Sequence, residues 1–191
     1  MKNRNWTVLI IGGASGTGKS ETAYKIAGYY GISVLEFDDI HIAVKPMVPA
    51  DKYPAIFDAD GHDWMNRGVE WNVNWLKDVS REMSEALERL VARHIDDDVP
   101  VIIEGDFIIP ELVKPLLTSK VKALFIQESE VSRIISNFQS RESGEPQSFR
   151  AEISVSYNNW IRKSCEELGM LTLESRPWDT ALDRVLELLA E

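Results

Sequence analysis

The sequence predicts an α/β fold: a three-layer α/β/α sandwich in which helices cover both faces of a five-stranded parallel sheet. Three observations predict this class. Short apolar runs alternate with longer stretches in which apolar residues recur at helical spacing. The apolar runs are continuous, which is typical of strands buried on both faces. The chain has 191 residues, 44% of them hydrophobic, enough for one well-cored domain over residues 1–191, and no internal repeat or long linker divides it.

Five apolar runs are predicted as strands, and most of the stretches between them as helices. The predicted strands cover residues 6–11, 32–37, 99–106, 121–127 and 170–175. The second strand is expected to end at Asp38 and Asp39. The predicted helices cover residues 19–30, 69–94, 110–117, 131–138, 153–168 and 181–189. The segment of about residues 41–75 is the most irregular and is interpreted as an insertion.

Composition argues against several classes of partner. The formal net charge is −10, so nonspecific binding to nucleic acid or to an anionic membrane is not expected. No apolar run approaches the ~18 residues that a membrane-spanning helix needs. Cys165 is the single cysteine, so no intrachain disulfide forms and a reducing, cytoplasmic compartment is predicted.

A glycine-rich stretch, GGASGTGKS, follows the first predicted strand and opens the first predicted helix. It matches the phosphate-binding pattern G-x-x-x-x-G-K-[ST] in the context that the pattern requires. Glycine lets successive backbone N–H groups turn toward a phosphate, and the helix N-terminus adds a positive field. The residues expected to hold the nucleotide here are Gly13, Ala14, Ser15, Gly16, Thr17, Gly18, Lys19 and Ser20, and Thr22, beyond the motif, is not included. Lys19 is expected to reach the terminal phosphates, and the Ser20 hydroxyl to coordinate Mg²⁺.

The loop predicts a nucleoside triphosphate but not the reaction. A GTPase is one alternative: residues 58–61 match D-x-x-G, but they end no apolar strand and no N-K-x-D follows. An oligomeric motor ATPase is another, but the third strand ends in EGD rather than in a double acid. Neither alternative is strictly excluded by the sequence.

Acidic residues lie at the carboxyl ends of the second and third predicted strands, at the edge of the sheet where ligands bind. Transfer to an alcohol needs a proton acceptor, and Asp38 is predicted to be that base. Asp39 is expected to point to the opposite face, because adjacent strand residues alternate, although either aspartate remains a candidate for the base. Glu104 is predicted to hold Mg²⁺ together with Ser20, directly or through a water bridge, and the alternative is a carboxylate that caps the turn EGDF. Gly105 is the kind of residue that lets a substrate pass close to the backbone.

Three arginines flank a break between two helices. Arg133 and Arg141 are eight residues apart, about two helical turns. Gly144 and Pro146 predict a loop that can close, so the segment of about residues 140–150 is interpreted as a lid. Arg141 is predicted to stabilise the transferred phosphoryl group, and Arg133 to contact the nucleotide, with Arg150 as a further candidate.

The irregular segment is expected to cover the pocket for the phosphate acceptor. Lys45 and Arg67 can bind an anionic acceptor there, whereas its tryptophans are interpreted first as core residues. His41 and His62 have no ligand spacing with a cysteine, so a zinc site is not expected.

In the order GGASGTGKS, FDDI, VIIEGDFIIPEL and FQSRE, the chain resembles the small-molecule kinases of the P-loop superfamily, in the branch of 2-phosphoglycerate kinase and chloramphenicol phosphotransferase. The resemblance implies ATP, Mg²⁺, transfer to a hydroxyl and the strand order 2-3-1-4-5. It implies that Asp38 is the proton acceptor, that Glu104 and Gly105 are the family's strand-three pair, and that Arg141 is the lid arginine. It also implies that SRPWD, with Arg176, lies against the adenine. Asp39 departs from the expected small hydroxyl residue.

The leading hypothesis is therefore an ATP- and Mg²⁺-dependent kinase of a small hydroxyl compound, with a phosphoglycerate-like acid among the candidates. The alternatives are a nucleoside or nucleotide kinase, and a nucleotide switch or ATPase that acts through a partner. A monomer or a homodimer is expected, without nucleic-acid or membrane partners.

Overall fold

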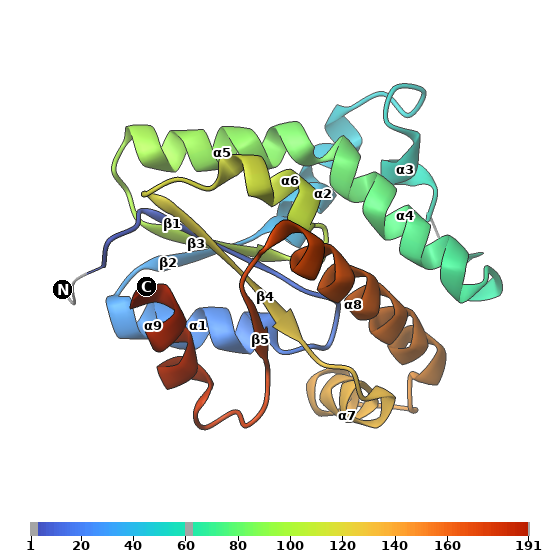
Figure 1. Ribbon diagram of the computed structural model, residues 1–191. Coiled ribbons are helices and arrows are strands. Elements are labelled where there is room, and N and C mark those ends of the chain that lie inside the picture. Colours follow the sequence, from blue (N-terminus) through green and yellow to red (C-terminus); the bar gives the residue numbers. More distant parts are fainter. Residues whose placement is uncertain (1–3, 60–62, 191) are drawn as a thin grey trace.

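A parallel sheet of five strands organises the chain (Figure 1). The computed structural model describes residues 4–59 and 63–190. The strand order is β2-β3-β1-β4-β5, and every pairing is parallel. The strands are β1 (Val8–Gly12), β2 (Ser33–Glu36), β3 (Val101–Gly105), β4 (Val121–Gln127) and β5 (Thr172–Glu174). The predicted fold class and strand order are confirmed.

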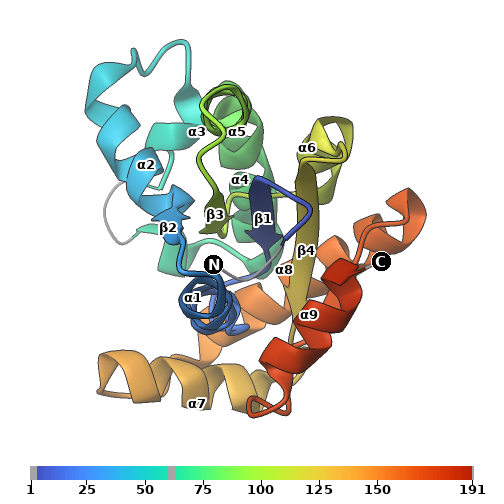
Figure 2. The same ribbon diagram turned by 90° about the vertical axis from the view of Figure 1, so that its left-hand side faces the viewer.

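Helices cover both faces of this sheet, and Figure 2 shows α1 and α9 on one side of it and α4, α5 and α6 on the other. The helices are α1 (Lys19–Tyr30), α2 (Phe37–Val44), α3 (Pro54–Phe57), α4 (Val69–Glu82), α5 (Ser84–Asp96), α6 (Pro110–Val113), α7 (Val131–Glu142), α8 (Ser148–Leu168) and α9 (Ala181–Ala190). Short 3-10 turns are η1 (Lys45–Met47), η2 (Asp63–Asn66) and η3 (Lys114–Leu116). In the part of the chain that the structure describes, no helix is both long and apolar enough to cross a membrane.

The central strand β1 is buried on both faces because its side chains alternate between two hydrophobic cores. Val8 and Ile10 belong to the core beneath α4, α5 and α8. Leu9 and Ile11 belong to the core beneath α1 and α9. This two-sided burial explains why the strand has a continuous apolar sequence rather than an alternating one.

The predicted helix over residues 69–94 is two helices, because the chain bends at Met83 (φ −87°, ψ −1°). Figure 1 shows α5 lying along the sheet while α4 leans away from it toward α3. The carboxylate of Glu82, just before the bend, accepts hydrogen bonds from the backbone N–H groups of Ala55 and Ile56 at 3.1 and 3.0 Å. Because of the bend, the apolar side chains of residues 69–94 pack both on the sheet and on the segment interpreted as an insertion.

The second strand is shorter than predicted, and the expectation that it ends at Asp38 and Asp39 is wrong. Strand β2 ends at Glu36, and α2 begins at Phe37. Phe37 is buried, and Ile40 and Val44 pack against the same core, which is helical spacing. Two acids in the first turn suit the positive end of a helix. Asp38 and Asp39 are therefore helical residues, and strand alternation does not govern where they point.

We expect Ile10→Ala to lower the free energy of unfolding by about 2–5 kcal/mol, because Ile10 is fully buried in the central strand and the truncation leaves a cavity. The matched control is Ile42→Ala in α2, where the side chain is 68% exposed and the cost should stay within about 0.5 kcal/mol. Urea unfolding followed by circular dichroism measures both. Equal losses for the two variants would contradict this description of the core.

Candidate functional site

The glycine-rich loop lies between β1 and α1, as the motif requires. Gly16 and Gly18 have φ angles of 76° and 92°, a region that favours glycine. A Cβ at Gly18 would lie 1.9 Å from the ring of Trp178. The Thr17 hydroxyl donates to the carbonyl of Ala14 at 2.8 Å, and the Asn137 side chain of α7 donates to the carbonyl of Gly16 at 2.8 Å. The backbone conformation of the glycine-rich loop is therefore fixed by its own hydrogen bond, by Asn137 of α7 and by Trp178 in the loop before α9.

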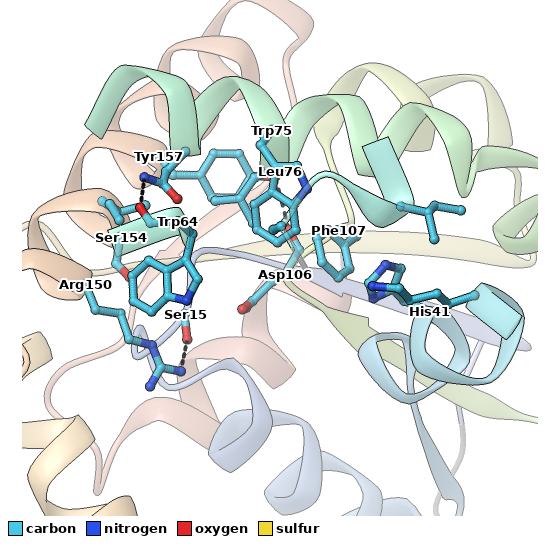
Figure 3. Close-up of a pocket in the computed structure, with 15 residues that line it drawn as sticks. Ser15, His41, Trp64, Trp75, Leu76, Asp106, Phe107, Arg150, Ser154 and Tyr157 are labelled. Carbon is cyan, nitrogen blue, oxygen red and sulfur yellow. Dashed lines mark hydrogen bonds between the residues drawn. The ribbon is translucent and has the colours of Figure 1, made fainter. Parts of the chain in front are cut away.

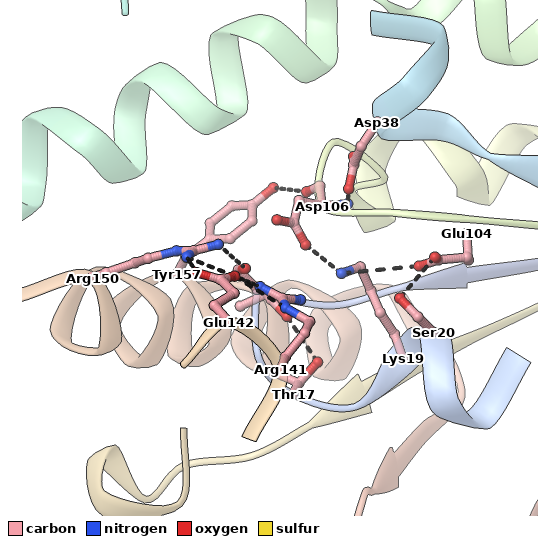
Figure 4. Close-up of polar contacts among 12 residues, drawn as sticks. Thr17, Lys19, Ser20, Asp38, Glu104, Asp106, Arg141, Glu142, Arg150 and Tyr157 are labelled. Carbon is pink, nitrogen blue, oxygen red and sulfur yellow. Dashed lines mark hydrogen bonds and ion pairs between the residues drawn. The ribbon is translucent and has the colours of Figure 1, made fainter. Parts of the chain in front are cut away.

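Lys19 is a buried cation surrounded by carboxylates (Figure 4). Its ammonium forms an ion pair with Asp106 and lies 3.9 Å from Oε2 of Glu104. Burial alone would lower the pKa of Lys19, but Asp106, Glu104 and Asp38 together raise it above its usual value. The lysine therefore stays protonated, as a ligand for phosphate must.

Ser20 and Glu104 form a hydroxyl–carboxylate pair beside this lysine. The Ser20 hydroxyl donates to Oε1 of Glu104 at 2.8 Å. Oε2 of Glu104 is buried and has no hydrogen-bond partner within residues 4–59 and 63–190. Burial raises the pKa of Glu104, while Lys19 and Ser20 oppose that rise. Within the same ranges no cluster of three or more His, Cys, Asp or Glu side chains could hold a metal by itself. The pair fits Mg²⁺, which commonly takes one or two protein oxygens and completes its shell with phosphates and water.

Asp38 lies at the start of α2 and faces the end of β3. Its two carboxylate oxygens lie 3.0 and 3.3 Å from the backbone nitrogen of Asp106, which donates to them. A Cβ at Gly105 would lie 2.9 Å from Oδ1 of Asp38 and 3.0 Å from Cβ of Phe37. A substrate was expected to pass close to the backbone of Gly105. In this structure the side chain of Asp38 lies in that space. Asp39 is exposed to solvent.

The environment of Asp38 changes its acidity. Burial, followed by repulsion from Asp106, raises the pKa of Asp38 to about 7, although the nearby Lys19 opposes the rise. A carboxylate with a pKa near neutrality is well matched to accept a proton at neutral pH.

Asp106 is the acid whose importance sequence reasoning missed. It forms the ion pair with Lys19 and also lines the cavity described below (Figure 3). Its backbone is fixed from both sides, because its N–H donates to Asp38 and its carbonyl accepts from the Tyr157 hydroxyl at 3.1 Å. The available signal was its position as the last residue of the third predicted strand.

A cavity of about 330 Å³ opens beside Asp106, beneath the segment interpreted as an insertion (Figure 3). Its walls come from the glycine-rich loop, α2, α3, η2, α4, the end of β3 and α8. They comprise Ser15, His41, Lys45, Ile56, Ala59, Trp64, Asn72, Trp75, Leu76, Asp106, Phe107, Arg150, Ile153, Ser154 and Tyr157. Lys45 lines this cavity as predicted, whereas Arg67 does not and lies 4.3 Å from the centre of the Trp71 ring. Residues 60–62, including His62 and the end of the D-x-x-G match, lie outside the described residues.

A second cavity, of about 700 Å³, opens on the other side of the loop. It is lined by Gly16, Gly18, Lys19, Ser20, Glu21, Tyr24, Ser136, Asn137, Phe138, Ser140, Arg141, Arg176 and Trp178. Arg176 donates to Asn137 at 3.2 Å and lies 5.2 Å from the centre of the Trp178 ring. Arg133 is not among these residues, and its guanidinium is paired with Glu128 and Glu130. The SRPWD segment thus contributes to this cavity, while Arg133 does not.

One carboxylate holds two arginines of the segment predicted to be a lid. Arg141 at the end of α7 and Arg150 at the start of α8 pair with Glu142. A hydrogen bond from Gln147 and the two arginines lower the pKa of Glu142 to about 2. Arg141 faces the second cavity, whereas Arg150 faces the first and donates to the Ser15 hydroxyl at 3.4 Å. The two predicted lid arginines therefore lie on opposite sides of the glycine-rich loop.

Known proteins resemble this chain in sequence and in fold. No family model matches it. It is 24% identical over 195 residues to 2-phosphoglycerate kinase of Methanocaldococcus jannaschii, covering 96% of this chain and 63% of that protein. It is also 24% identical to 2-phosphoglycerate kinase of Methanopyrus kandleri, covering 96% of this chain and 60% of that protein. The chain thus spans about three-fifths of these relatives' length, and the predicted resemblance is confirmed.

Solved structures of small-molecule kinases share the fold. A gluconokinase from Sinorhizobium meliloti matches with a TM-score of 0.57 and 17% identity, covering 99% of this chain and 94% of that one. A shikimate kinase from Acinetobacter baumannii matches with a TM-score of 0.59 and 17% identity, covering 97% of this chain and 92% of that one. At this identity the likeness shows the P-loop fold.

The raised pKa of Asp38 predicts how stability depends on pH. The folded protein binds more protons than the unfolded chain between the ordinary pKa of about 3.8 and the folded value of about 7. The stability of the parent should therefore fall as pH rises through this window. Asp38→Asn removes the titration and keeps an oxygen acceptor for the Asp106 N–H, so the variant should gain on the order of 1–3 kcal/mol over the parent by pH 8.

Urea unfolding of the ligand-free protein at pH 5, 6, 7 and 8 measures this effect. Asp39→Asn, at the exposed neighbour, is the control and should follow the parent curve. Parallel curves for the parent and Asp38→Asn would show that burial of Asp38 does not shift its titration.

Proposed function

We propose that this protein is an ATP-dependent small-molecule kinase that transfers the γ-phosphoryl group to a hydroxyl. The observation that carries the proposal is the placement of Lys19. This lysine belongs to a phosphate-binding loop, sits among three carboxylates and lines the larger cavity, while its ion-pair partner Asp106 lines the smaller one. A phosphate donor in the larger cavity and an acceptor in the smaller one would then meet at the ion pair of Lys19 and Asp106. The 2-phosphoglycerate kinase relatives support this reading.

The larger cavity is the proposed site for ATP. The backbone N–H groups of the loop and the Lys19 ammonium bind the phosphates as they arrive. Arg176 and Trp178 line the same cavity and are proposed to contact the base. Ser20 and Glu104 would hold Mg²⁺, directly or through water, and the bound ion neutralises charge on the phosphates.

The smaller cavity is the proposed site for the acceptor, and the pair Asp38 and Asp106 accepts its proton. Asp106 faces this cavity, while the raised pKa of Asp38 suits a base. When Lys19 binds phosphate, its charge is shared with the nucleotide and Asp106 becomes able to face the hydroxyl. Arg141 and Arg150 are proposed to stabilise the transferred group from the donor and acceptor sides.

The relatives make a phosphoglycerate-like acid the first acceptor to test. Magnesium-dependent ADP release over a panel of hydroxyl compounds decides the class of reaction. Stimulation by sugar acids or other non-nucleoside alcohols supports the proposal. Stimulation by nucleosides alone would indicate a nucleoside kinase, and unstimulated hydrolysis with nucleotide-dependent partner binding would indicate a switch.

Lys19→Ala should weaken Mg²⁺–ATP binding about 100-fold, or ~2.7 kcal/mol, because it removes the charge that the loop presents to the terminal phosphates. Isothermal titration calorimetry measures the affinity. Lys163→Ala, at an exposed lysine of α8 paired with Glu167, is the control and should bind as the parent does. Unchanged affinity in Lys19→Ala would remove the loop from nucleotide binding.

Asp38→Asn and Asp106→Asn should each lower kcat with the best acceptor by about 10²–10⁴-fold, because each removes part of the proposed proton acceptor. Affinity for ATP should be unchanged, or higher in Asp106→Asn, because Lys19 then loses a competing partner. The parent kcat/KM should rise with pH through about 7, since the base of the free enzyme must be ionised, and this limb should vanish in Asp38→Asn. Asp39→Asn is the matched control, and transfer at the parent rate by both variants would reject the pair.

A further inference from the structure

One amide side chain connects two walls of the larger cavity. We infer that Asn137 is a positioning residue for the nucleotide, because it links Arg176, on the side proposed for the base, to Gly16 of the phosphate loop. Contact with the base and binding of the phosphates are then coupled. This role rests on the proposed function for the identity of the larger cavity as the nucleotide site, and neither the loop motif nor the family resemblance assigns it.

Both ends of the Asn137 amide are used. Its nitrogen donates to the carbonyl of Gly16 at 2.8 Å, and its oxygen accepts from Nη2 of Arg176 at 3.2 Å. A carboxamide can donate at one end and accept at the other. If the amide were reversed, its oxygen would face the Gly16 carbonyl and its NH₂ group would face the guanidinium. Asn137 therefore matches its two partners in one orientation.

On the loop side, the bond from Asn137 fixes one peptide group. The carbonyl of Gly16 and the N–H of Thr17 belong to the same trans peptide and point in opposite directions. This N–H donates to the carbonyl of Ala14 at 3.3 Å, so the peptide is held at both ends. Gly16 also lies against α7, since a Cβ there would come within 2.8 Å of the Phe138 ring. Asn137 thus acts on the loop conformation on which phosphate binding depends.

On the other side, two groups hold the guanidinium of Arg176. Its Nε lies 3.6 Å from Oε2 of Glu128, a carboxylate that is only 2% exposed, and its Nη2 donates to Asn137. A guanidinium is planar and rigid, so contacts on two of its nitrogens fix its orientation. Arg133, one turn before Asn137 in α7, pairs with the same carboxylate at 3.6 Å. The helix α7 therefore orients Arg176 through a direct bond and a shared carboxylate.

The base side also contacts the loop at a point that does not involve Asn137. The Trp178 ring packs on Gly18, where a Cβ would come within 1.9 Å of it. The ammonium of Lys25 in α1 donates to the Trp178 carbonyl at 3.1 Å. The segment that carries Arg176 is thus anchored by other contacts, so a change at Asn137 reports the link itself rather than the loss of this wall.

The link makes the base contribute to phosphate binding. Contacts with a remote part of a ligand can be used to position its reacting part. A base that contacts Arg176 stabilises the orientation of Asn137 that holds Gly16, and bound phosphates favour the same orientation of the loop. By reciprocity, each contact then strengthens the other. A nucleotide gains from this coupling, whereas a polyphosphate without a base does not.

A double-mutant cycle on the full chain tests the link. Isothermal titration calorimetry measures the affinity for Mg²⁺–ADP of the parent, Asn137→Ala, Arg176→Ala and the double variant. Each single variant should bind about tenfold more weakly. The double variant should lose less than about 30-fold, because either change breaks the same link. A loss of about 100-fold, the product for independent residues, would overturn the inference, as would parent affinity in Asn137→Ala.

Mg²⁺–tripolyphosphate is the matched ligand, since it has the phosphates but no base. Its affinity should change less than twofold in Arg176→Ala, and its cycle should show no coupling. The same coupling with both ligands would show that the two residues only support the loop, and would also overturn the inference. Gln139→Ala, at an exposed amide of α7 that lines neither cavity, is the control and should bind both ligands as the parent does.

Urea unfolding without ligand checks that each variant is folded, and Asn137→Ser replaces Asn137→Ala in the cycle if the alanine variant does not fold. The two proposals fail differently. If the coupling is found with ADP while no hydroxyl compound stimulates ADP release, the proposed transfer fails and the role of Asn137 stands. If release is stimulated and the ADP cycle shows no coupling, the kinase function stands and the role of Asn137 fails.

Discussion

The site depends on the compensation of one buried charge. Lys19 is enclosed by protein, and a lone ammonium in that position would lose its proton or destabilise the fold. Asp106 and Glu104 prevent this, and they come from the end of a strand more than 80 residues away in sequence. The parallel sheet supplies the proximity, because Gly12 of β1 pairs in register with Gly105 of β3. The fold therefore brings the phosphate-binding lysine and its counter-charges to one edge.

Two glycines determine how closely neighbouring segments approach the end of β3 and the phosphate loop. The absence of a side chain at Gly105 leaves room for the carboxylate of Asp38, which in turn holds the backbone of Asp106. The same principle applies at Gly18, where Trp178 packs directly on the loop. The helix α2 thus reaches the end of β3, and the loop before α9 reaches the phosphate loop, because glycine occupies the contact points.

The helices α7 and α8 connect the two cavities. Asn137 of α7 holds the carbonyl of Gly16, and Glu142 at the end of α7 holds Arg150 of α8, which reaches Ser15. Phe138 and Ile134 pack with Ala151 in a small core of their own. Movement of these helices would therefore alter contacts on both sides of the loop together, which is the behaviour expected of the segment interpreted as a lid.

Elements with strong local signals could be predicted from the order of the amino acids alone. Continuous apolar runs located the five strands, and the spacing of glycines before Lys19 located the phosphate loop, because both patterns depend on residues adjacent in the chain. The family resemblance supplied the strand order. The sequence also placed Asp38, Glu104 and Lys45 near the site, although their roles stay predictions.

Other features became visible only in the folded chain. Asp38 begins a helix, and Asp106 contacts Lys19 and also lines a cavity. Trp64 and Trp75 line that cavity, whereas Trp71 does not. Those features depend on contacts between distant segments, and side-chain packing, unlike hydrophobic periodicity, leaves no regular spacing in the chain.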